Sequence, residues 1–430
     1  MALSFLALIL FLKVLTANSG PAYKEVLPEN PPWLPNGIPD DCRDNNVTEC
    51  QAILNEGYFC HHYQKFQRFK AKPSEKEDEA KWEIDEKDPS EVAKSVESVI
   101  EKLGKSGALK MIKDEFMRSR NYFPEGSKKA FANNEKHNRY RDILLLDRTR
   151  VVLKNTGHDY IHASKVSVGR NVFICAQGPM LCSVENFWAM IVQERVKVIV
   201  MLCRFIEGGQ EKCCEYIPKS RGRLVFGSFK IECTAREILP NTDGATCGQI
   251  EVTFIGRTYK LEHIWYENWA DHAAPENLAA TMELLRVCRK KRQNAPVLIH
   301  CSAGVGRSGC FVAIELAAHH AATRPVFSME AVLKDLRDQR MHCIQNDMQY
   351  LYVYRGFVEM LIDRGIVKRN DVLKFITDYE HLLKRKRSKP TPDSAEKNQE
   401  SKEKESKEKE SKEKDEFIPS VYFNDPYRYY

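Results

Sequence analysis

Two residues, Cys301 and Arg307, stand at opposite ends of a glycine-rich segment that contains Gly304 and Gly306. Backbone amides and a nearby guanidinium stabilise a thiolate, which is the nucleophilic form of cysteine. The planar guanidinium of arginine also fits two oxygens of a phosphate group. Because one short segment holds all of these groups, it predicts a site at which a thiolate attacks phosphorus.

Two other interpretations of this segment stay open at this point. Gly304, Gly306 and Gly309 also match the dinucleotide pattern G-x-G-x-x-G, which would indicate a nucleotide-dependent oxidoreductase. That pattern is expected in an early βαβ unit, whereas this one lies late in the chain. Alternatively, Cys301 is a buried core residue, as free cysteines commonly are. The spacing of Cys301 and Arg307 within a glycine-rich turn favours the phosphate site.

The segments on either side of the turn predict how it is held. Residues 297–299 are apolar and predict a short buried strand, and residues 310–322 have a helical pattern. A strand, a glycine-rich turn and a helix together direct backbone N–H groups and the helix dipole at an anion. Elsewhere strand patterns alternate with helical ones, so we predict an α/β fold with a mixed sheet and helices on both faces.

The sequence H-C-S-A-G-V-G-R-S-G at residues 300–309 resembles the phosphate-binding loop of the protein tyrosine phosphatase family. The resemblance runs from about residue 116 to about residue 364, and it includes N-R-Y-R-D at 138–142, Q-G-P at 177–179 and D-Y-I-H-A at 159–163, where His162 replaces Asn. It implies a highly twisted mixed sheet and a single, non-receptor-like domain. It also implies hydrolysis of phosphotyrosine in proteins, with neither cofactor nor metal.

The resemblance further implies a role for each matching residue. Cys301 is the nucleophile that forms a phosphocysteine, Arg307 binds the phosphate, and Asp271 is first the general acid and then the base. Ser308 stabilises the departing thiolate, and Gln345 positions the attacking water. The expected substrate-binding residues are Tyr140, Asp142, Ser302, Ala303, Gly304, Val305, Gly306 and Gln349. The expected supporting residues are His300, Glu207, Lys212 and Trp269.

The segment around the expected acid departs from the family pattern. Ala270 stands where the family has Pro, Ala273 where it has Gly, and Ile217 where it has a nearby Trp. Losing one Pro constraint changes a conformational balance by about 0.4–1 kcal/mol, whereas losing the acid costs about 10²–10⁴-fold in rate. Since Asp271 is retained, we predict an active phosphatase. The alternative is a catalytically weak pseudo-phosphatase that binds phosphotyrosine, because its altered loop rarely closes.

The chain of 430 residues is long enough for further segments around this domain. The charged repeat E-S-K-E-K at 400–414 has no apolar residues and cannot bury a core. We predict a signal peptide at 1–20, a flank with Pro and Cys at 21–70, a charged linker at 71–88, the phosphatase domain with its N-terminal helices at 89–365, a C-terminal helix at 366–388, and a disordered charged tail at 389–430.

Signals for the cellular compartment conflict. The apolar run at 2–12 resembles the hydrophobic part of a secretory signal, so we predict a secreted or secretory-pathway protein. Membrane association is expected only if that run stays as an uncleaved anchor. Eleven of the fourteen cysteines lie in the phosphatase-like region without obvious pairing, which favours a cytoplasmic alternative.

Neither C-x-x-C nor H-E-x-x-H occurs, so no metal site is predicted. The net charge is +6, and the Lys and Arg residues are not arranged in the pattern expected of a nucleic-acid-binding surface. No nucleic-acid partner is therefore predicted.

Overall fold

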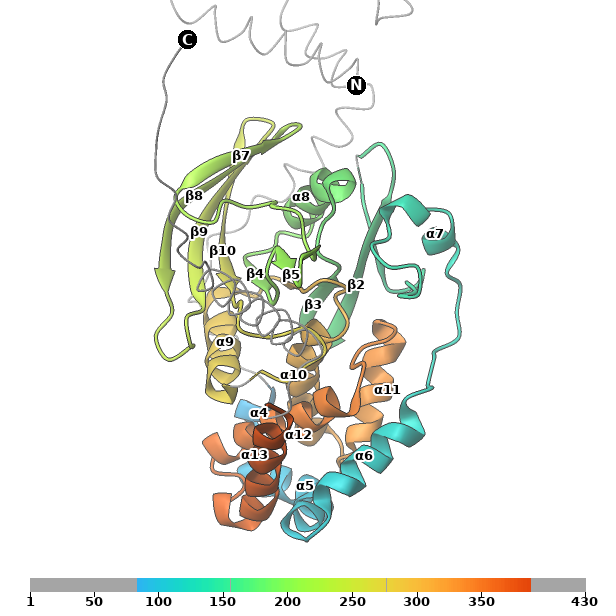
Figure 1. Ribbon diagram of the computed structural model, residues 1–430, viewed down its shortest axis with the longest axis vertical. Helices are drawn as coiled ribbons and strands as arrows, with labels where there is room; N and C mark the ends of the chain where they lie inside the picture. Colours follow the sequence, from blue (N-terminus) through green and yellow to red (C-terminus); the bar gives the residue numbers. More distant parts are fainter. Residues whose placement is uncertain (1–82, 155, 276, 388–430) are drawn as a thin grey trace, which may run out of the picture. The chain divides into compact units, whose positions relative to one another are not determined.

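The computed structural model describes residues 83–154, 156–275 and 277–387 (Figure 1). In this part of the chain, nine strands form one sheet in the order β1-β2-β3-β11-β4-β10-β9-β8-β7, and β5 pairs with β6 in a separate hairpin. The strands are β1 (Arg150–Val152), β2 (Tyr160–Val168), β3 (Asn171–Ala176), β4 (Val198–Met201), β5 (Ile206–Glu207), β6 (Gln210–Glu211), β7 (Gly222–Phe226), β8 (Phe229–Ile238), β9 (Thr246–Phe254), β10 (Arg257–Trp265) and β11 (Val297–His300).

The centre of the sheet is parallel and its two sides are antiparallel. Strands β3, β11, β4 and β10 run parallel to one another, with Val297 of β11 opposite Phe173 of β3 and Val198 of β4. The outer pairs, β2 with β3 and β10 with β9, are antiparallel. Every residue of β4 and β11 is buried, as expected for parallel strands that are covered on both faces.

Helices cover the sheet and account for most of the remaining core. They are α4 (Glu83–Glu86), α5 (Pro89–Gly104), α6 (Ala108–Ser119), α7 (Lys129–Ala132), α8 (Val184–Gln193), α9 (Leu278–Lys291), α10 (Arg307–Thr323), α11 (Met329–Gln339), α12 (Asp347–Asp363) and α13 (Leu373–Arg387), with 3₁₀ helices η2 (Glu135–His137), η3 (Leu181–Ser183) and η4 (Arg369–Val372). Phe187 of α8 packs against His300 of β11 with ring centroids 5.7 Å apart. Strands separate α8 from the group that contains α10, α11 and α12 (Figure 1). The predicted mixed sheet flanked by helices is confirmed.

The helices α5 and α6 occupy the segments where the sequence predicts helices. Val92, Val96 and Leu103 of α5 are buried, as their helical spacing indicates. Ser95 of α5 donates a hydrogen bond from Oγ to the carbonyl oxygen of Ala321 in α10, at 2.8 Å. Helix α5 therefore packs against α10, and α6 packs against α12.

Two predicted boundaries differ from the structure. The end of the predicted linker forms α4, in which Ile84 is 3% exposed and belongs to the core. The predicted C-terminal helix is divided into η4 and α13. The predicted signal peptide, N-terminal flank and charged tail lie outside the described residues. Among the described helices, none combines the length and the apolar character needed to cross a bilayer.

Candidate active site

The turn after β11, residues 301–306, is called the phosphate loop below. Gly304 has a left-handed backbone with φ +70°, and a Cβ there would overlap the carbonyl group of Ala176 in β3. A Cβ at Gly306 would overlap the side chain of Gln345. The N–H of Gly178 donates to the carbonyl oxygen of Ser302 at 2.9 Å. The loop thus fits between its neighbours because glycine occupies its two closest approaches.

The thiol of Cys301 lies inside this loop and is 3% exposed. The backbone N–H of Gly304 donates to its Sγ at 3.2 Å. Helix α10 begins at Arg307, so the positive end of its dipole is directed at the same loop. An amide N–H and the start of a helix are therefore both directed at this sulfur.

The side chain of Arg307, the first residue of α10, is fully buried. Its NH1 and NH2 donate to the two carboxylate oxygens of Glu207 at 2.6 and 3.1 Å, and NH1 also donates to the carbonyl oxygen of Trp269 at 2.9 Å. Burial disfavours its charge, but the neighbouring Cys301 and Glu207 outweigh burial and raise the pKa of Arg307. Its Nε is buried and has no hydrogen-bond partner among the described residues, so it remains available to an anion.

Asp271, the expected acid, lies between two cations. Its Oδ1 is 3.2 Å from NH2 of Arg307, and its Oδ2 is 3.2 Å from Nζ of Lys212. The backbone N–H of His272 also donates to Oδ1 at 3.1 Å. Burial by itself raises the pKa of Asp271, but Arg307, His272 and Lys212 outweigh it, and the pKa lies below the ordinary value. This carboxylate is therefore ionised beside the arginine.

The segment that carries Asp271, residues 269–275, is called the acid loop below. Trp269 is fully buried, donates from Nε1 to the carbonyl oxygen of Ala273 at 2.9 Å, and packs edge-on against Tyr352 with centroids 5.2 Å apart. Ala270 is exposed, and Ile217 is fully buried. The tryptophan thus connects the start of the loop to Ala273, and the Ala270 and Ala273 departures leave this hydrogen bond in place.

Residues 345–349, called the glutamine segment below, supply two glutamines to the site: Gln345 precedes α12, and Gln349 lies in its first turn. Gln345 is half-buried beside Gly306, and its backbone N–H donates to Oε1 of Gln349 at 2.8 Å. Gln349 is fully buried, and its Nε2 has no hydrogen-bond partner among the described residues. Asn346 caps α12 by accepting from the N–H of Gln349 at 2.9 Å, and its Nδ2 donates to the carbonyl oxygen of His272 at 2.9 Å. The glutamine segment therefore contacts both the phosphate loop and the acid loop.

Of the expected substrate-binding residues outside the phosphate loop, Tyr140 contacts the loop. Tyr140 is half-buried, and its hydroxyl is 2.7 Å from Oγ of Ser302. That Oγ donates to the carbonyl oxygen of Lys212 at 3.2 Å. Val305 is fully buried, whereas Asp142 is exposed. The structure thus places Tyr140 against the loop and leaves Asp142 at the surface.

His300 and Ser308 flank the phosphate loop on its buried side. Nδ1 of His300 is 3.2 Å from the carbonyl oxygen of Cys301, and Nε2 is 2.8 Å from the hydroxyl of Tyr216, which also contacts His263 at 2.9 Å. Burial lowers the pKa of His300 to about 4, so this imidazole is neutral at pH 7. Oγ of Ser308 is buried without a hydrogen-bond partner among the described residues, and its expected contact with the thiolate stays a prediction.

Arg340 belongs to the site, although the sequence analysis missed it. It is 1% exposed, and its guanidinium donates to the carbonyl oxygens of Gly304 at 3.2 Å and Ala303 at 3.0 Å. One of its nitrogens also lies 3.1 Å from Nδ1 of His162. In the sequence, Arg340 is only an arginine next to apolar residues, and this does not reveal which groups its guanidinium contacts. These contacts hold the backbone carbonyl groups of the phosphate loop in place.

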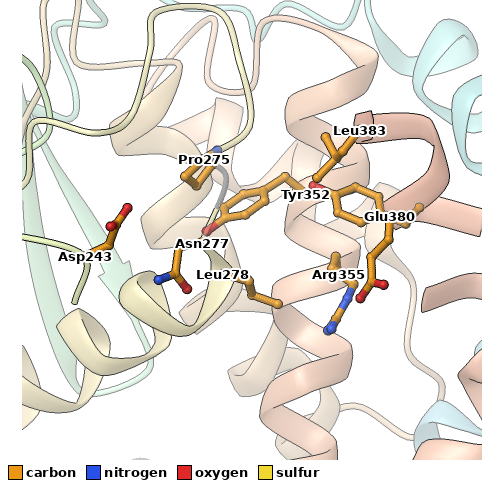
Figure 2. Close-up of a pocket in the computed structure, with 9 residues that line it drawn as sticks. Asp243, Pro275, Asn277, Leu278, Tyr352, Arg355, Glu380 and Leu383 are labelled. Atoms are coloured by element: carbon orange, nitrogen blue, oxygen red, sulfur yellow. The ribbon is translucent and has the colours of Figure 1, made fainter. Parts of the chain in front are cut away.

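A cavity of about 400 Å³ lies apart from the thiol, between the end of the acid loop and α13. Pro275, Tyr352 and Glu380 are among the side chains around it (Figure 2). Neither Cys301 nor Arg307 lines this cavity, so it is not the site of the expected chemistry.

Residues 134–359 match the family model described as protein-tyrosine phosphatase, which is more than half of the 430 residues. The chain belongs to the protein-tyrosine phosphatase family. The family resemblance seen in the sequence is confirmed.

Several phosphatases are similar to the chain. It is 33% identical over 238 residues to "Tyrosine-protein phosphatase non-receptor type 20" of Rattus norvegicus, covering 53% of this chain and 55% of the relative. It is 31% identical over 256 residues to "Tyrosine-protein phosphatase non-receptor type 9" of Rattus norvegicus, covering 54% and 43%. The chain spans about half the length of the curated relatives it matches. A solved structure described as "Structural basis of PTPN18 fingerprint on distinct HER2 tyrosine phosphorylation sites" is 28% identical with a TM-score of 0.52, covering 55% of this chain and 87% of that one.

The predicted secretory location was wrong. The similar phosphatases are named non-receptor types, which points to the cytoplasm rather than to secretion. The eleven cysteines of the described residues are all free. The secretory prediction rested on the apolar run at 2–12. An apolar run of that length also occurs in buried core helices and in interfacial segments, so it does not by itself specify secretion. That run lies outside the described residues.

Proposed function

We propose that the protein hydrolyses phosphotyrosine in proteins through a phosphocysteine formed on Cys301. The observation that supports this most strongly is the arrangement around the sulfur. An amide N–H of the phosphate loop donates to Sγ, and the fully buried Arg307 at the start of α10 is held by Glu207 and lies beside Asp271. Nucleophile, anion-binding groups and acid are then within one site, as two-step phosphoryl transfer requires.

The chemistry follows from these positions. The thiolate of Cys301 attacks phosphorus, an S–P bond forms, and the bond from phosphorus to the phenolic oxygen breaks. Asp271 gives its proton to the leaving phenolate. Water positioned by Gln345 then attacks phosphorus, Asp271 takes a proton from it, and the S–P bond breaks to return the thiolate and release phosphate. Arg307 and the loop amides bind the equatorial oxygens, whose charge is spread in both transition states.

Substrate binding would also prepare the acid. Arg307 and Lys212 keep Asp271 ionised, yet the first step needs its carboxyl protonated. A phosphate dianion at Arg307 places negative charge next to Asp271 and raises the pKa of the carboxyl, since like charges disfavour ionisation. In this proposal the correct substrate provides the charge that makes the acid competent.

The depth of the thiol favours phosphotyrosine over shorter phosphorylated side chains. Cys301 is 3% exposed, and Tyr140 contacts Ser302 at the side of the loop. Among phosphorylated residues, phosphotyrosine has the length to reach such a sulfur. In the proposal, residues 302–306 and Gln349 surround the phosphate, and Asp142 at the surface holds the substrate backbone. The proposed partner is thus a protein or peptide that carries phosphotyrosine.

A second candidate function is phosphotyrosine binding without efficient turnover. Two features favour it: Arg307, His272 and Lys212 hold the pKa of Asp271 below its ordinary value, and the acid loop carries Ala270 and Ala273 in place of the family's Pro and Gly. The phosphate loop and Arg307 would still bind the phosphate group. Turnover of a small aryl phosphate by the wild-type protein separates the two functions.

The test compares the wild-type protein with Cys301→Ser. We expect the variant to lose hydrolysis of an aryl phosphate and to keep binding of a phosphotyrosine peptide, because the amides and Arg307 are unchanged. Cys288→Ser, a buried thiol in α9, is the matched control and should keep turnover. Turnover by Cys301→Ser would overturn the nucleophile assignment. Peptide binding by a wild-type protein that shows no turnover would favour the binding function.

A further inference from the structure

The backbone of the acid loop is held by side chains on both sides of Asp271. On one side the carbonyl oxygen of Trp269 accepts from Arg307 at 2.9 Å. On the other side the carbonyl oxygen of His272 accepts from Nδ2 of Asn346 at 2.9 Å. The first bond comes from the residue expected to bind phosphate. The second comes from a neutral side chain that has no expected role in the chemistry.

Asn346 is itself held firmly in place. Its Oδ1 caps α12 by accepting from the N–H of Gln349 at 2.9 Å, and its carbonyl oxygen accepts from the N–H of Tyr350 at 3.1 Å. Its amide group therefore uses the oxygen for the helix and the nitrogen for the acid loop. Since Gln345 directly precedes it, one residue connects the expected water-positioning segment to the acid loop.

The backbone of His272 has an unfavourable conformation that its surroundings must stabilise. Its φ of +55° places it in the left-handed region, which is unfavourable for a residue with a side chain. Backbone conformations of this kind cost about 1–3 kcal/mol and persist where the surroundings hold them. The bond from Asn346 acts on the carbonyl of this strained residue, next to Asp271. Loss of the bond should let the loop relax and move the carboxyl of Asp271.

We propose that Asn346 is a positioning residue that ties the acid loop to the glutamine segment, so that Asp271 and Gln345 are held together at the phosphate. The proposal rests on the proposed phosphatase function. In a chain with Ala270 and Ala273 in its acid loop, this side-chain bond supplies part of the order that Pro and Gly supply in the family pattern.

Two variants separate this bond from the cap of α12. Asn346→Asp keeps an oxygen that caps the helix and replaces the donor by an acceptor that faces the carbonyl of His272. Asn346→Ser also keeps a capping oxygen, stays neutral, and is too short to reach that carbonyl. Asn134→Asp is the matched control, because Nδ2 of Asn134 donates to the carbonyl oxygen of Ala130 at 2.8 Å and does not contact the acid loop.

The readout is kcat/KM for aryl phosphates with good and poor leaving groups. One hydrogen bond contributes about 0.5–1.5 kcal/mol, so both Asn346 variants should lower kcat/KM for poor leaving groups by about 2- to 12-fold. Good leaving groups need no proton from Asp271, and their kcat/KM should be unchanged. Asn134→Asp should leave both values unchanged. An equal loss for good and poor leaving groups, or no loss, would overturn the proposal.

Hydrogen exchange of residues 269–275 tests the bond without using activity. We expect faster exchange of these amides in both Asn346 variants, with exchange in the central strands β4 and β11 as in the wild type. Unchanged exchange would overturn the proposal even in an active enzyme. If the wild-type protein shows no turnover, the proposed function fails, and faster exchange in the variants would still support the tie between the two segments.

Discussion

NH2 of Arg307 lies 3.2 Å from Oδ1 of Asp271, so the cation expected to bind phosphate also holds the expected acid. The same guanidinium donates two hydrogen bonds to Glu207 and one to the carbonyl of Trp269. Arg307 thus connects the phosphate loop, the acid loop and β5. A change at this residue should affect anion binding and acid catalysis together.

Arg307→Lys should lose both affinity and rate, because a single ammonium cannot replace the planar fork. We expect at least a tenfold weaker inhibition by vanadate and a large fall in turnover of an aryl phosphate. Arg289→Lys is the control, since Arg289 pairs with the buried Glu315 away from the thiol. It should alter stability without altering vanadate inhibition. Near-normal vanadate inhibition of Arg307→Lys would contradict the assigned role.

Asp271→Ala should slow poor leaving groups far more than good ones, because only poor ones need a proton as they depart. The expected loss for poor leaving groups is about 10²–10⁴-fold in kcat/KM. Glu267→Ala, which removes an exposed carboxylate paired with Arg204, should have little effect. Equal rates for Asp271→Ala and wild type with a poor leaving group would show that another group is the acid.

Ala270→Pro should raise turnover by about two- to fivefold if closure of the acid loop limits the rate. Pro restricts the conformations of the loop and holds the preceding Trp269 out of the helical region. The exposed position of Ala270 leaves space for the ring. Steady-state turnover of an aryl phosphate is the measurement, with Ala273→Gly measured beside it as the second change toward the family pattern. An unchanged rate would show that loop closure is not limiting.

His162→Asn should flatten the acid side of the stability profile. Burial and the nearby Arg340 lower the pKa of His162 to about 3, against about 6.5 in the unfolded chain. The unfolded state therefore binds the proton first, and this residue lowers stability as pH falls from about 6.5 toward 3. The slope from one such group is at most about 1.4 kcal/mol per pH unit.

Urea unfolding at several pH values between 7 and 4 measures this slope. His162→Asn should lose less stability than wild type over that range, since Asn does not titrate. Parallel profiles for wild type and His162→Asn would mean that His162 is protonated equally in both states.

The local pattern of residues determined much of this protein. The phosphate loop between β11 and α10 follows from an apolar run, closely spaced glycines and a helical pattern, all within one short segment. The buried face of α5 follows in the same way from the spacing of Val92, Val96 and Leu103. These features depend on neighbours in the chain, and such interactions are visible in a sequence.

Only the tertiary structure decided which distant groups meet. The guanidinium of Arg340 donates to the carbonyl oxygens of Gly304 and Ala303, which lie 36 and 37 residues earlier in the chain. By its place in the sequence, Asn346 is only the residue before a helix. In the structure its side-chain nitrogen donates to the carbonyl oxygen of His272 in the acid loop. Hydrogen bonds of this kind depend on distance and direction between side chains far apart in sequence. Those quantities exist only once the parallel centre of the sheet and the helices behind it have brought the segments together.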